Sequence, residues 1–261
     1  MVGLLAMALA GCAVTGGITA DAEGGIDRAT SEKPVTSEAQ GKARTHVELG
    51  SAYLDAGRYG VALDEAKIAQ AYDRNYAPGH LLMGLVYSFL DQNELALASF
   101  QQAERLAPYD PEVANAYGWY LCNRDRQSDG LVRLERAARN PYYRFPARAL
   151  ANAGLCELNR RNDKAAEGYF QRSIQIERNN PQVLFQLANI FYREGNPVRA
   201  RQWLTELQAR MPAPTAETLW LGLRIERKAG ERDAEARYAN QLKRDFPASD
   251  EYAALTQGKF D

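Results

Sequence analysis

The sequence has little of what enzymes and nucleic-acid-binding proteins usually need. Only two of its 261 residues are histidines, and the formal net charge is −1 at pH 7. It contains no glycine-rich phosphate loop, HExxH metal motif or GxSxG nucleophile motif. It also contains no basic run or aromatic-basic motif, which argues against a nucleic-acid partner. We therefore expect no enzymatic activity, metal ion, cofactor or small-molecule substrate.

The two histidines are His46 and His80, and they stand 34 residues apart. A catalytic or metal-binding role is one interpretation of this pair. However, the same spacing separates many other residues of similar type in the chain. We therefore favour a shared packing role for the two side chains.

Two ladders of small residues run through the sequence with a period of 34. Both ladders advance in steps of 34, 34, 36, 34 and 34, so they share one two-residue insertion near residues 142–146. Small residues at these positions would let two helices cross closely, and larger neighbours would fill the space beside them. The first ladder is Gly50, Gly84, Gly118, Gly154, Ala188 and Gly222, and the second is Ala62, Ala96, Gly130, Ala166, Ala200 and Ala234.

This pattern resembles the tetratricopeptide (TPR) repeat, a helix-turn-helix unit of 34 residues. A single hairpin cannot bury its apolar face, so stacked hairpins would share one continuous core. The prediction is an all-α, right-handed superhelical solenoid, with a capping tail over residues 249–261. The six predicted repeats span residues 43–76, 77–110, 111–144, 147–180, 181–214 and 215–248.

The fourth repeat is the least regular. Glu157 occupies a position that is aromatic or aliphatic in the other repeats, and Ala153 replaces a large residue. Both follow the two-residue insertion. We expect a local irregularity in this part of the solenoid.

The first residues suggest export and lipid attachment. Residues 1–11 are small and apolar, too short to span a membrane but similar to the hydrophobic part of a signal peptide. Leu9-Ala10-Gly11-Cys12 resembles the bacterial lipobox, which implies that Cys12 carries lipid. Ala13 is not aspartate, and by the usual rule for such lipoproteins this directs the anchor to the outer membrane. The alternative is a chance apolar start with an ordinary cysteine.

Two further expectations concern this end of the chain. No Lys or Arg precedes the apolar segment, although signal peptides usually begin with positive charge. We therefore expect the natural start to lie upstream of Met1. Residues 12–42 are rich in small and polar residues, and we expect them to form a flexible tether between the lipid and the repeats.

Cys122 and Cys156 lie late in the first helices of repeats three and four. The first helices of neighbouring repeats line the same wall of a TPR solenoid. In an oxidising compartment a disulfide between them would persist. We predict a Cys122–Cys156 disulfide, and the alternative is two half-buried thiols that pack as small apolar groups.

First-helix positions outside the ladders should line a concave surface. In the first half of the chain many of them are apolar, and an exposed apolar groove with amide groups is typical of a peptide-binding surface. Trp119 is the leading candidate for a dominant contact, because aromatic anchors tend to carry the binding energy. Some of these side chains could instead pack between repeats. The predicted groove residues are Val47, Leu54, Leu81, Leu85, Phe89, Asn115, Trp119, Asn123 and Asn189.

Three segments carry a more specific resemblance. They are Asn115-Ala-Tyr-Gly-Trp-Tyr-Leu-Cys122, Asn140-Pro-Tyr-Tyr-Arg-Phe-Pro146 and Asn152-Ala-Gly-Leu-Cys156. With the six repeats and the lipobox, they resemble type IV pilus biogenesis/stability proteins of the PilW/PilF type. The resemblance implies a pilotin, an outer-membrane lipoprotein on the periplasmic side that helps the pilus secretin to form or localise its multimers.

Two other functions suit a TPR lipoprotein. One is a periplasmic scaffold for cell-wall or outer-membrane assembly machinery. The other is an enzyme regulator that acts through the same groove. Fold alone does not separate these from a pilotin.

Overall fold

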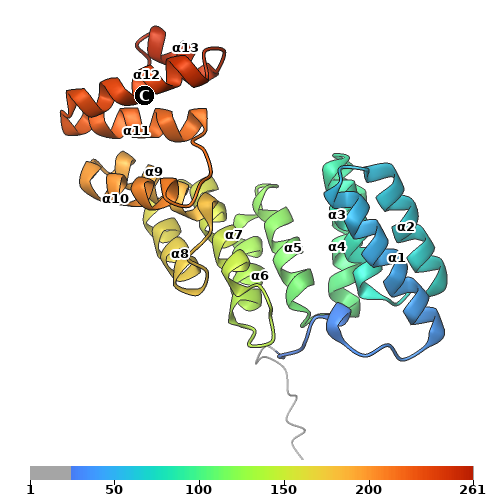
Figure 1. Ribbon diagram of the computed structural model, residues 1–261. Coiled ribbons are helices and arrows are strands. Elements are labelled where there is room, and N and C mark those ends of the chain that lie inside the picture. The colour runs from blue at the N-terminus through green and yellow to red at the C-terminus, as the bar shows by residue number, and fades with distance from the viewer. Residues whose placement is uncertain (1–24, 261) are drawn as a thin grey trace, which may run out of the picture.

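The computed structural model describes residues 25–260. Over these residues it contains 13 α-helices, one short 3-10 helix and no strand, so the all-α prediction is confirmed. Twelve of the helices form six antiparallel hairpins that follow one another along the chain (Figure 1). The hairpins are α1 (Glu38–Asp55) with α2 (Tyr59–Tyr72), α3 (Ala77–Phe89) with α4 (Asn93–Leu106), α5 (Pro111–Cys122) with α6 (Gln127–Arg139), α7 (Pro146–Asn159) with α8 (Asp163–Ile176), α9 (Pro181–Arg193) with α10 (Pro197–Gln208), and α11 (Ala216–Ala229) with α12 (Arg232–Asp245).

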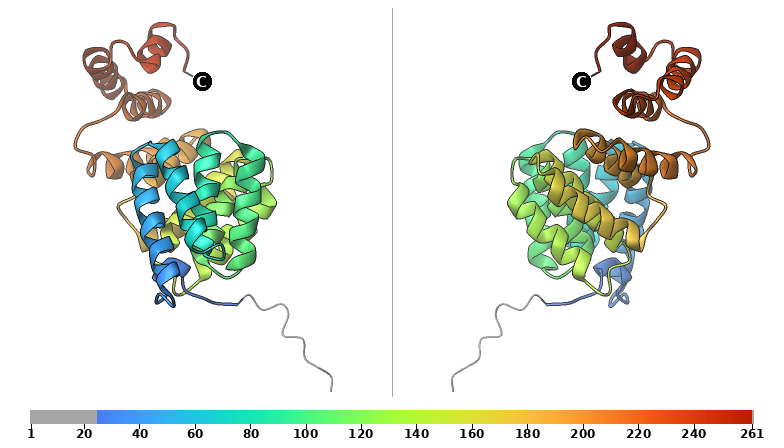
Figure 2. Two further views of the ribbon diagram at one scale, coloured as in Figure 1. Left: turned by 90° about the vertical axis from the view of Figure 1, so that its right-hand side faces the viewer. Right: turned by 90° about the vertical axis from the view of Figure 1, so that its left-hand side faces the viewer.

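The hairpins stack into a TPR-like solenoid. Each hairpin packs against the next, and a final helix, α13 (Asp250–Thr256), covers α11 and α12. Seen from the side, α11 to α13 lie beyond the body formed by the first four hairpins (Figure 2). Proline marks the start of five helices. It occupies the first turn of α3, α5, α7, α9 and α10, where a missing N–H costs little.

The small-residue ladders mark the places where helices cross. A Cβ atom added to Gly154 would lie 2.4 Å from the Phe170 ring, and one added to Gly84 would lie 2.9 Å from the Phe100 ring. Both rings are completely buried. Glycine is therefore required because a large side chain of the second helix fills the space that a Cβ would need.

The ends of the stack depart from the ladder pattern. Leu49, one of the large residues beside a ladder glycine, is 42% exposed, whereas its equivalents Tyr117, Leu187 and Leu221 are buried. Ala234 in the last hairpin is only half-buried. Among residues 25–260 no further hairpin packs on the outer side of the first or last repeat, so Leu49 and Ala234 lack a packing partner that their equivalents have.

The fourth hairpin keeps a regular helix pair despite Glu157. The Glu157 side chain is only 5% exposed, and its two oxygens accept hydrogen bonds from Arg160 Nη1 and Asn162 Nδ2, both at 3.1 Å. A buried carboxylate is tolerated when it is paired and hydrogen-bonded in this way. The sequence irregularity is therefore absorbed by local polar contacts.

The turn of each hairpin contains one residue with a left-handed backbone. Glycine fills this position in the first, fifth and sixth hairpins (Gly57, Gly195 and Gly230), as expected from the conformational freedom of glycine. In the fourth hairpin it is Arg161, with φ of 58°. For a residue with a Cβ atom this conformation costs roughly 1–2 kcal/mol.

Replacing Arg161 with glycine should therefore stabilise the protein. We expect Arg161→Gly to raise the free energy of unfolding by about 0.5–1 kcal/mol, since part of the relief is offset by the greater flexibility of glycine in the unfolded chain. Gly57→Ala is the reverse test, because it adds a Cβ atom at the equivalent left-handed position of the first hairpin. Nothing lies within 4 Å of that Cβ, so the change tests backbone conformation and not packing. It should cost about 1 kcal/mol. Urea unfolding measures the free energy of unfolding of both variants. If both substitutions stabilise the protein, or both destabilise it, this explanation is wrong.

Two boundary predictions were wrong. Helix α1 begins at Glu38, five residues before the predicted first repeat, because Ser37 caps it by accepting a hydrogen bond from Gln40 N. The described part of the predicted flexible tether, residues 25–42, is also ordered against the solenoid. We call residues 25–36 the N-terminal strap. The rest of the proposed tether, the apolar leader of residues 1–11 and Cys12 lie outside the described residues.

Polar groups of the solenoid hold the N-terminal strap. Thr30 N donates to Asp110 Oδ2 at 2.6 Å, and Asn140 Nδ2 donates to the Asp27 carbonyl oxygen at 2.8 Å. Ala29, which is 2% exposed, is the only residue of the N-terminal strap that is buried, and its side chain is small. The sequence predicted a flexible tether here because it has few large apolar residues. The N-terminal strap is instead held by hydrogen bonds to the solenoid.

Candidate functional site

A groove of about 720 Å³ lies along the first helices of the first four hairpins. We call it the first-helix groove. Helices α1, α3, α5 and α7 form its walls, and Ser31 of the N-terminal strap and Tyr143 of the α6–α7 loop complete it. Its lining residues are Ser31, Val47, Glu48, Ser51, Ala52, Asp55, Pro78, Leu81, Leu82, Leu85, Glu112, Asn115, Ala116, Trp119, Tyr143, Arg148 and Asn152.

Five of the nine residues predicted for the groove lie in it. Val47, Leu81 and Asn115 occupy one repeat position on α1, α3 and α5, and Leu85 and Trp119 occupy a second position one turn further along. Val47, Leu81, Leu85 and Trp119 are half-buried, so each leaves part of its apolar surface accessible. The groove therefore has an apolar floor that spans three hairpins.

The other four predicted residues lie elsewhere. Leu54 packs into the core between the first two hairpins. Phe89 is 60% exposed at the end of α3 and stacks on Tyr59, with ring centroids 5.2 Å apart. Asn123 is exposed after α5 and donates from Nδ2 to the Trp119 carbonyl oxygen, whereas Asn189 is half-buried on α9. None of these four residues lines the groove.

One end of the groove is polar. Asn152 Nδ2 donates to Asn115 Oδ1 at 3.0 Å, and Glu112 and Arg148 lie beside them. Sequence reasoning missed Glu112, Arg148 and Tyr143. Glu112 and Arg148 are equivalent to Pro78 in the repeat frame. Including this first-helix position in the predicted groove would have found both residues. Tyr143 has no such signal, because it belongs to the two-residue insertion.

The N-terminal strap closes this polar end. Ser31 Oγ donates to Glu112 Oε2 at 3.0 Å. Burial of the Glu112 carboxyl raises its pKa above the usual range, and the nearby carboxylates of Asp110 and Glu32 act in the same direction. The neutral form of Glu112 is therefore favoured in the folded protein more than in the unfolded chain.

Glu112→Gln should stabilise the protein at neutral pH. A carboxyl whose folded pKa is raised contributes stability below its unfolded pKa of about 4.3, and this contribution is lost as pH rises through the folded pKa. Glutamine keeps an acceptor for Ser31 but does not ionise. We expect the variant to gain stability over the native protein at pH 7 and to lose that gain near pH 4, as measured by urea unfolding. A gain that does not depend on pH would contradict this explanation.

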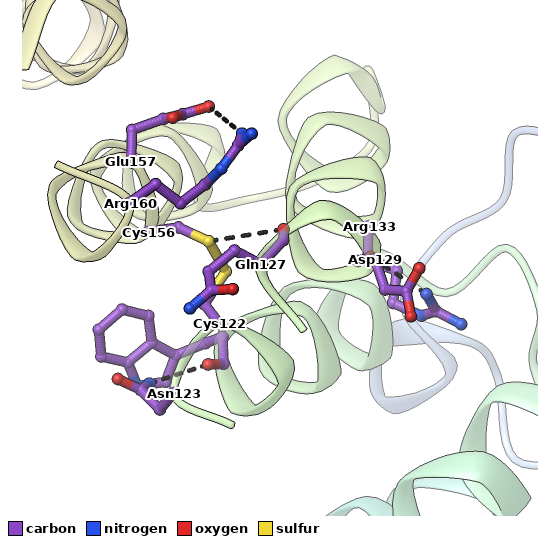
Figure 3. Close-up of a disulfide and its surroundings, with 9 residues drawn as sticks. Cys122, Asn123, Gln127, Asp129, Arg133, Cys156, Glu157 and Arg160 are labelled. Atoms are coloured by element: carbon purple, nitrogen blue, oxygen red, sulfur yellow. Dashed lines mark hydrogen bonds and ion pairs between the residues drawn. A yellow bond between two sulfur atoms is a disulfide. The ribbon is translucent and has the colours of Figure 1, made fainter. Parts of the chain in front are cut away.

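The structure joins Cys122 and Cys156 by a disulfide, as the sequence suggested (Figure 3). Their Cα atoms are 5.3 Å apart, and both side chains are fully buried. The bond ties the end of α5 to α7, directly before the buried Glu157. It therefore crosslinks two adjacent walls of the first-helix groove, next to the half-buried Trp119 that packs against the same cluster.

Both histidines make structural contacts. His46 Nδ1 lies 2.6 Å from Glu65 Oε2, and its ring stacks on Tyr72. His80 bonds to Gln70 and to the Arg74 carbonyl oxygen. Between residues 25 and 260 no cluster of His, Cys, Asp and Glu could hold a metal ion.

Residues 77–110, the second hairpin, match the tetratricopeptide repeat family. The type IV pilus assembly protein PilF of Pseudomonas aeruginosa is 30% identical over 254 residues, which cover 97% of this chain and 95% of PilF. The chain belongs to the PilF family of type IV pilus assembly proteins.

Solved structures of the PilF family have the same fold. PilW, described as a widely conserved type IV pilus biogenesis factor, has a TM-score of 0.77 and 27% identity, covering 82% of this chain and 98% of PilW. PilF of Pseudomonas aeruginosa has a TM-score of 0.76 and 28% identity, covering 85% of this chain and 100% of PilF. The family resemblance inferred from the Tyr-Gly-Trp-Tyr-Leu-Cys segment is therefore confirmed.

For this PilF-family chain, the comparisons indicate a helical-repeat protein of pilus assembly, and such proteins generally act as non-enzymatic scaffolds. In the described part of the chain, none of the helices has the length and apolar character needed to cross a membrane. The first-helix groove is the feature through which a pilus-assembly partner could be held.

Proposed function

We propose that this protein is an outer-membrane lipoprotein adaptor that captures a segment of the pilus secretin in the first-helix groove and promotes formation of secretin multimers. The observation that carries the proposal is the apolar floor of Val47, Leu81, Leu85 and Trp119, which stays accessible on the stacked first helices. The similarity to type IV pilus assembly and biogenesis proteins supports a role in pilus assembly.

The groove specifies the chemistry of the bound segment. Helix-in-groove recognition uses a row of apolar anchors. The four apolar residues of the groove floor lie on the neighbouring helices α1, α3 and α5 and form such a row. The polar end offers Arg148, Asn152 and the Glu112 carboxyl. A fitting segment therefore presents apolar side chains toward Trp119 and Leu85 and hydrogen-bonding groups toward the N-terminal strap.

In this proposal the lipid on Cys12 holds the protein at the outer membrane. The chain enters the solenoid at Gly25, where the glycine backbone lies against the Tyr109 ring. Twelve residues separate Cys12 from Gly25, and even fully extended they would reach at most about 45 Å. The anchored groove would therefore work close to the membrane in which the secretin ring forms.

The test is secretin assembly in cells that lack this protein. We expect detergent-resistant secretin multimers to disappear, or to remain in the inner-membrane fraction, while secretin monomer persists. Complementation with Cys12→Ala should restore the protein but not the outer-membrane multimers. Multimers of normal amount and location would reject the secretin role and favour a scaffold for other envelope machinery.

A further inference from the structure

A second cluster of aromatic and cationic side chains lies on α9 and α11, in the last two hairpins (Figure 1). It combines two aromatic rings, Tyr192 and Trp220, with the cationic side chains of Arg224, Arg227 and Lys228. We call these five residues the aromatic-cationic site. None of them lines the first-helix groove.

The chain's own tail occupies this site. After α13, Gly258 adopts a left-handed backbone with φ of 69°, and Lys259 N donates to the Ala254 carbonyl oxygen at 2.9 Å. This helix end reverses the chain and brings Phe260 onto Trp220, with ring centroids 5.6 Å apart and planes inclined by 23°. Phe260 is therefore stacked on the Trp220 ring.

Cations surround the bound Phe260. The Arg227 guanidinium lies 3.7 Å from the centre of the Phe260 ring and also pairs with Glu235 at 2.8 Å. Arg224 lies between two rings, 4.9 Å from Tyr192 and 5.6 Å from Trp220. Such contacts are attractive because the ring faces carry negative potential.

Two of these cations lack a carboxylate partner among residues 25–260. Lys228 Nζ donates only to the Tyr192 carbonyl oxygen, at 3.0 Å, and Arg224 Nε is buried without a hydrogen-bond partner. Burial lowers the pKa of Arg224, and the neighbouring Arg193 acts in the same direction. Among residues 25–260, positive charge at this site is therefore only partly compensated by acids.

We propose that the aromatic-cationic site binds a segment of a partner protein in which an aromatic side chain is flanked by carboxylates, and that Phe260 occupies the site until this segment displaces it. The aromatic residue takes the place of Phe260 on Trp220. The flanking carboxylates pair with Arg224 and Lys228, which have no carboxylate partner among residues 25–260. A charged bidentate pair is stronger than the contacts these groups make in the free protein.

In this proposal Phe260 competes with the partner segment for the Trp220 ring. A binding site that is open in only one tenth of the molecules shows an apparent affinity reduced about tenfold. Phe260→Ser keeps the length of the tail but removes the ring that stacks on Trp220. The vacant site should therefore bind an acidic aromatic peptide more tightly than the native protein does.

The experiment uses the whole chain and a synthetic probe, acetyl-Asp-Glu-Phe-Asp-Glu-amide, with binding followed by the NMR shift of the tryptophan indole groups. We expect the peptide to bind Phe260→Ser about tenfold more tightly than the native chain. Adding Arg224→Gln should weaken binding to Phe260→Ser at least about fivefold, because the charged partner is lost. A peptide with alanine in place of phenylalanine, and one with Asn and Gln in place of the acids, should each lose binding.

The proposal fails if the probe binds neither chain, or if it binds both equally. It also fails if the neutral peptide binds as well as the acidic one, since the cations would then play no part. Thermal unfolding of each variant provides the folding control, and Trp220→Ala supplies a second test. It should abolish probe binding in the Phe260→Ser chain while leaving partner capture by the first-helix groove intact.

Discussion

Loss of the Cys122–Cys156 disulfide should lower the free energy of unfolding by about 3–4 kcal/mol, since the bond closes a loop of 34 residues in the unfolded chain. Both cysteines are completely buried, so a Cys122→Ala, Cys156→Ala double variant leaves no charged or polar group behind. A protein of this length should lose on the order of 10 °C in melting temperature.

Thermal unfolding with and without reductant measures this effect. A Cys12→Ser background removes the third cysteine of the sequence from the experiment. Reductant should lower the melting temperature of the parent protein but not that of the double variant. Two reactive thiols in the unfolded, unreduced parent would show that the bond does not form.

The disulfide should also matter for the groove. It connects α5, which carries Asn115 and Trp119, to α7, which carries Arg148 and Asn152. The double variant should therefore bind its partner more weakly even at temperatures where it remains folded. This loss of affinity separates a role in shaping the groove from a role in stability alone.

Trp119→Ala should weaken capture of the secretin about 30- to 1,000-fold, the range typical of a central aromatic contact in a protein interface. Trp119 is half-buried in the groove, and it also packs against the buried cluster around the disulfide, which includes Leu134 and Ala153. The variant should stay folded, because several buried neighbours of the cluster remain. Affinity for purified secretin and the melting temperature are the two measurements.

Trp203→Ala is the matched control. Trp203 is also half-buried, but it lies on α10, a second helix, and packs on the core of the later hairpins. We expect it to lose stability without losing affinity for secretin. Equal affinity losses for the two variants would mean that the binding defect of Trp119→Ala arises from general destabilisation.

The hairpins could be predicted because close helix crossings leave a direct mark on the sequence. Gly84 and Gly154 face buried phenylalanine rings that exclude a Cβ atom, so the ladder records the geometry itself. Val47, Leu81 and Trp119 could be placed in one groove for the same reason. A fixed repeat frame assigns each first-helix position to one side of the helix.

Contacts made outside the repeat frame could not be predicted. The N-terminal strap is fixed by Asp110, Glu112 and Asn140, which are distant in sequence and are ordinary polar residues when read alone. Phe260 similarly reaches Trp220 only because Gly258 reverses the chain after α13. Hydrogen bonds and chain reversals of this kind carry no periodic pattern.

Site-specific photo-crosslinking in cells tests the central claim that secretin binds in the first-helix groove. A photoreactive amino acid replaces Leu85 in the groove, or Val198, which is 61% exposed on α10, as a control. We expect a crosslinked adduct with the secretin from position 85 and none from position 198. Absence of secretin from the position-85 adducts, or equal crosslinking from both positions, would contradict it.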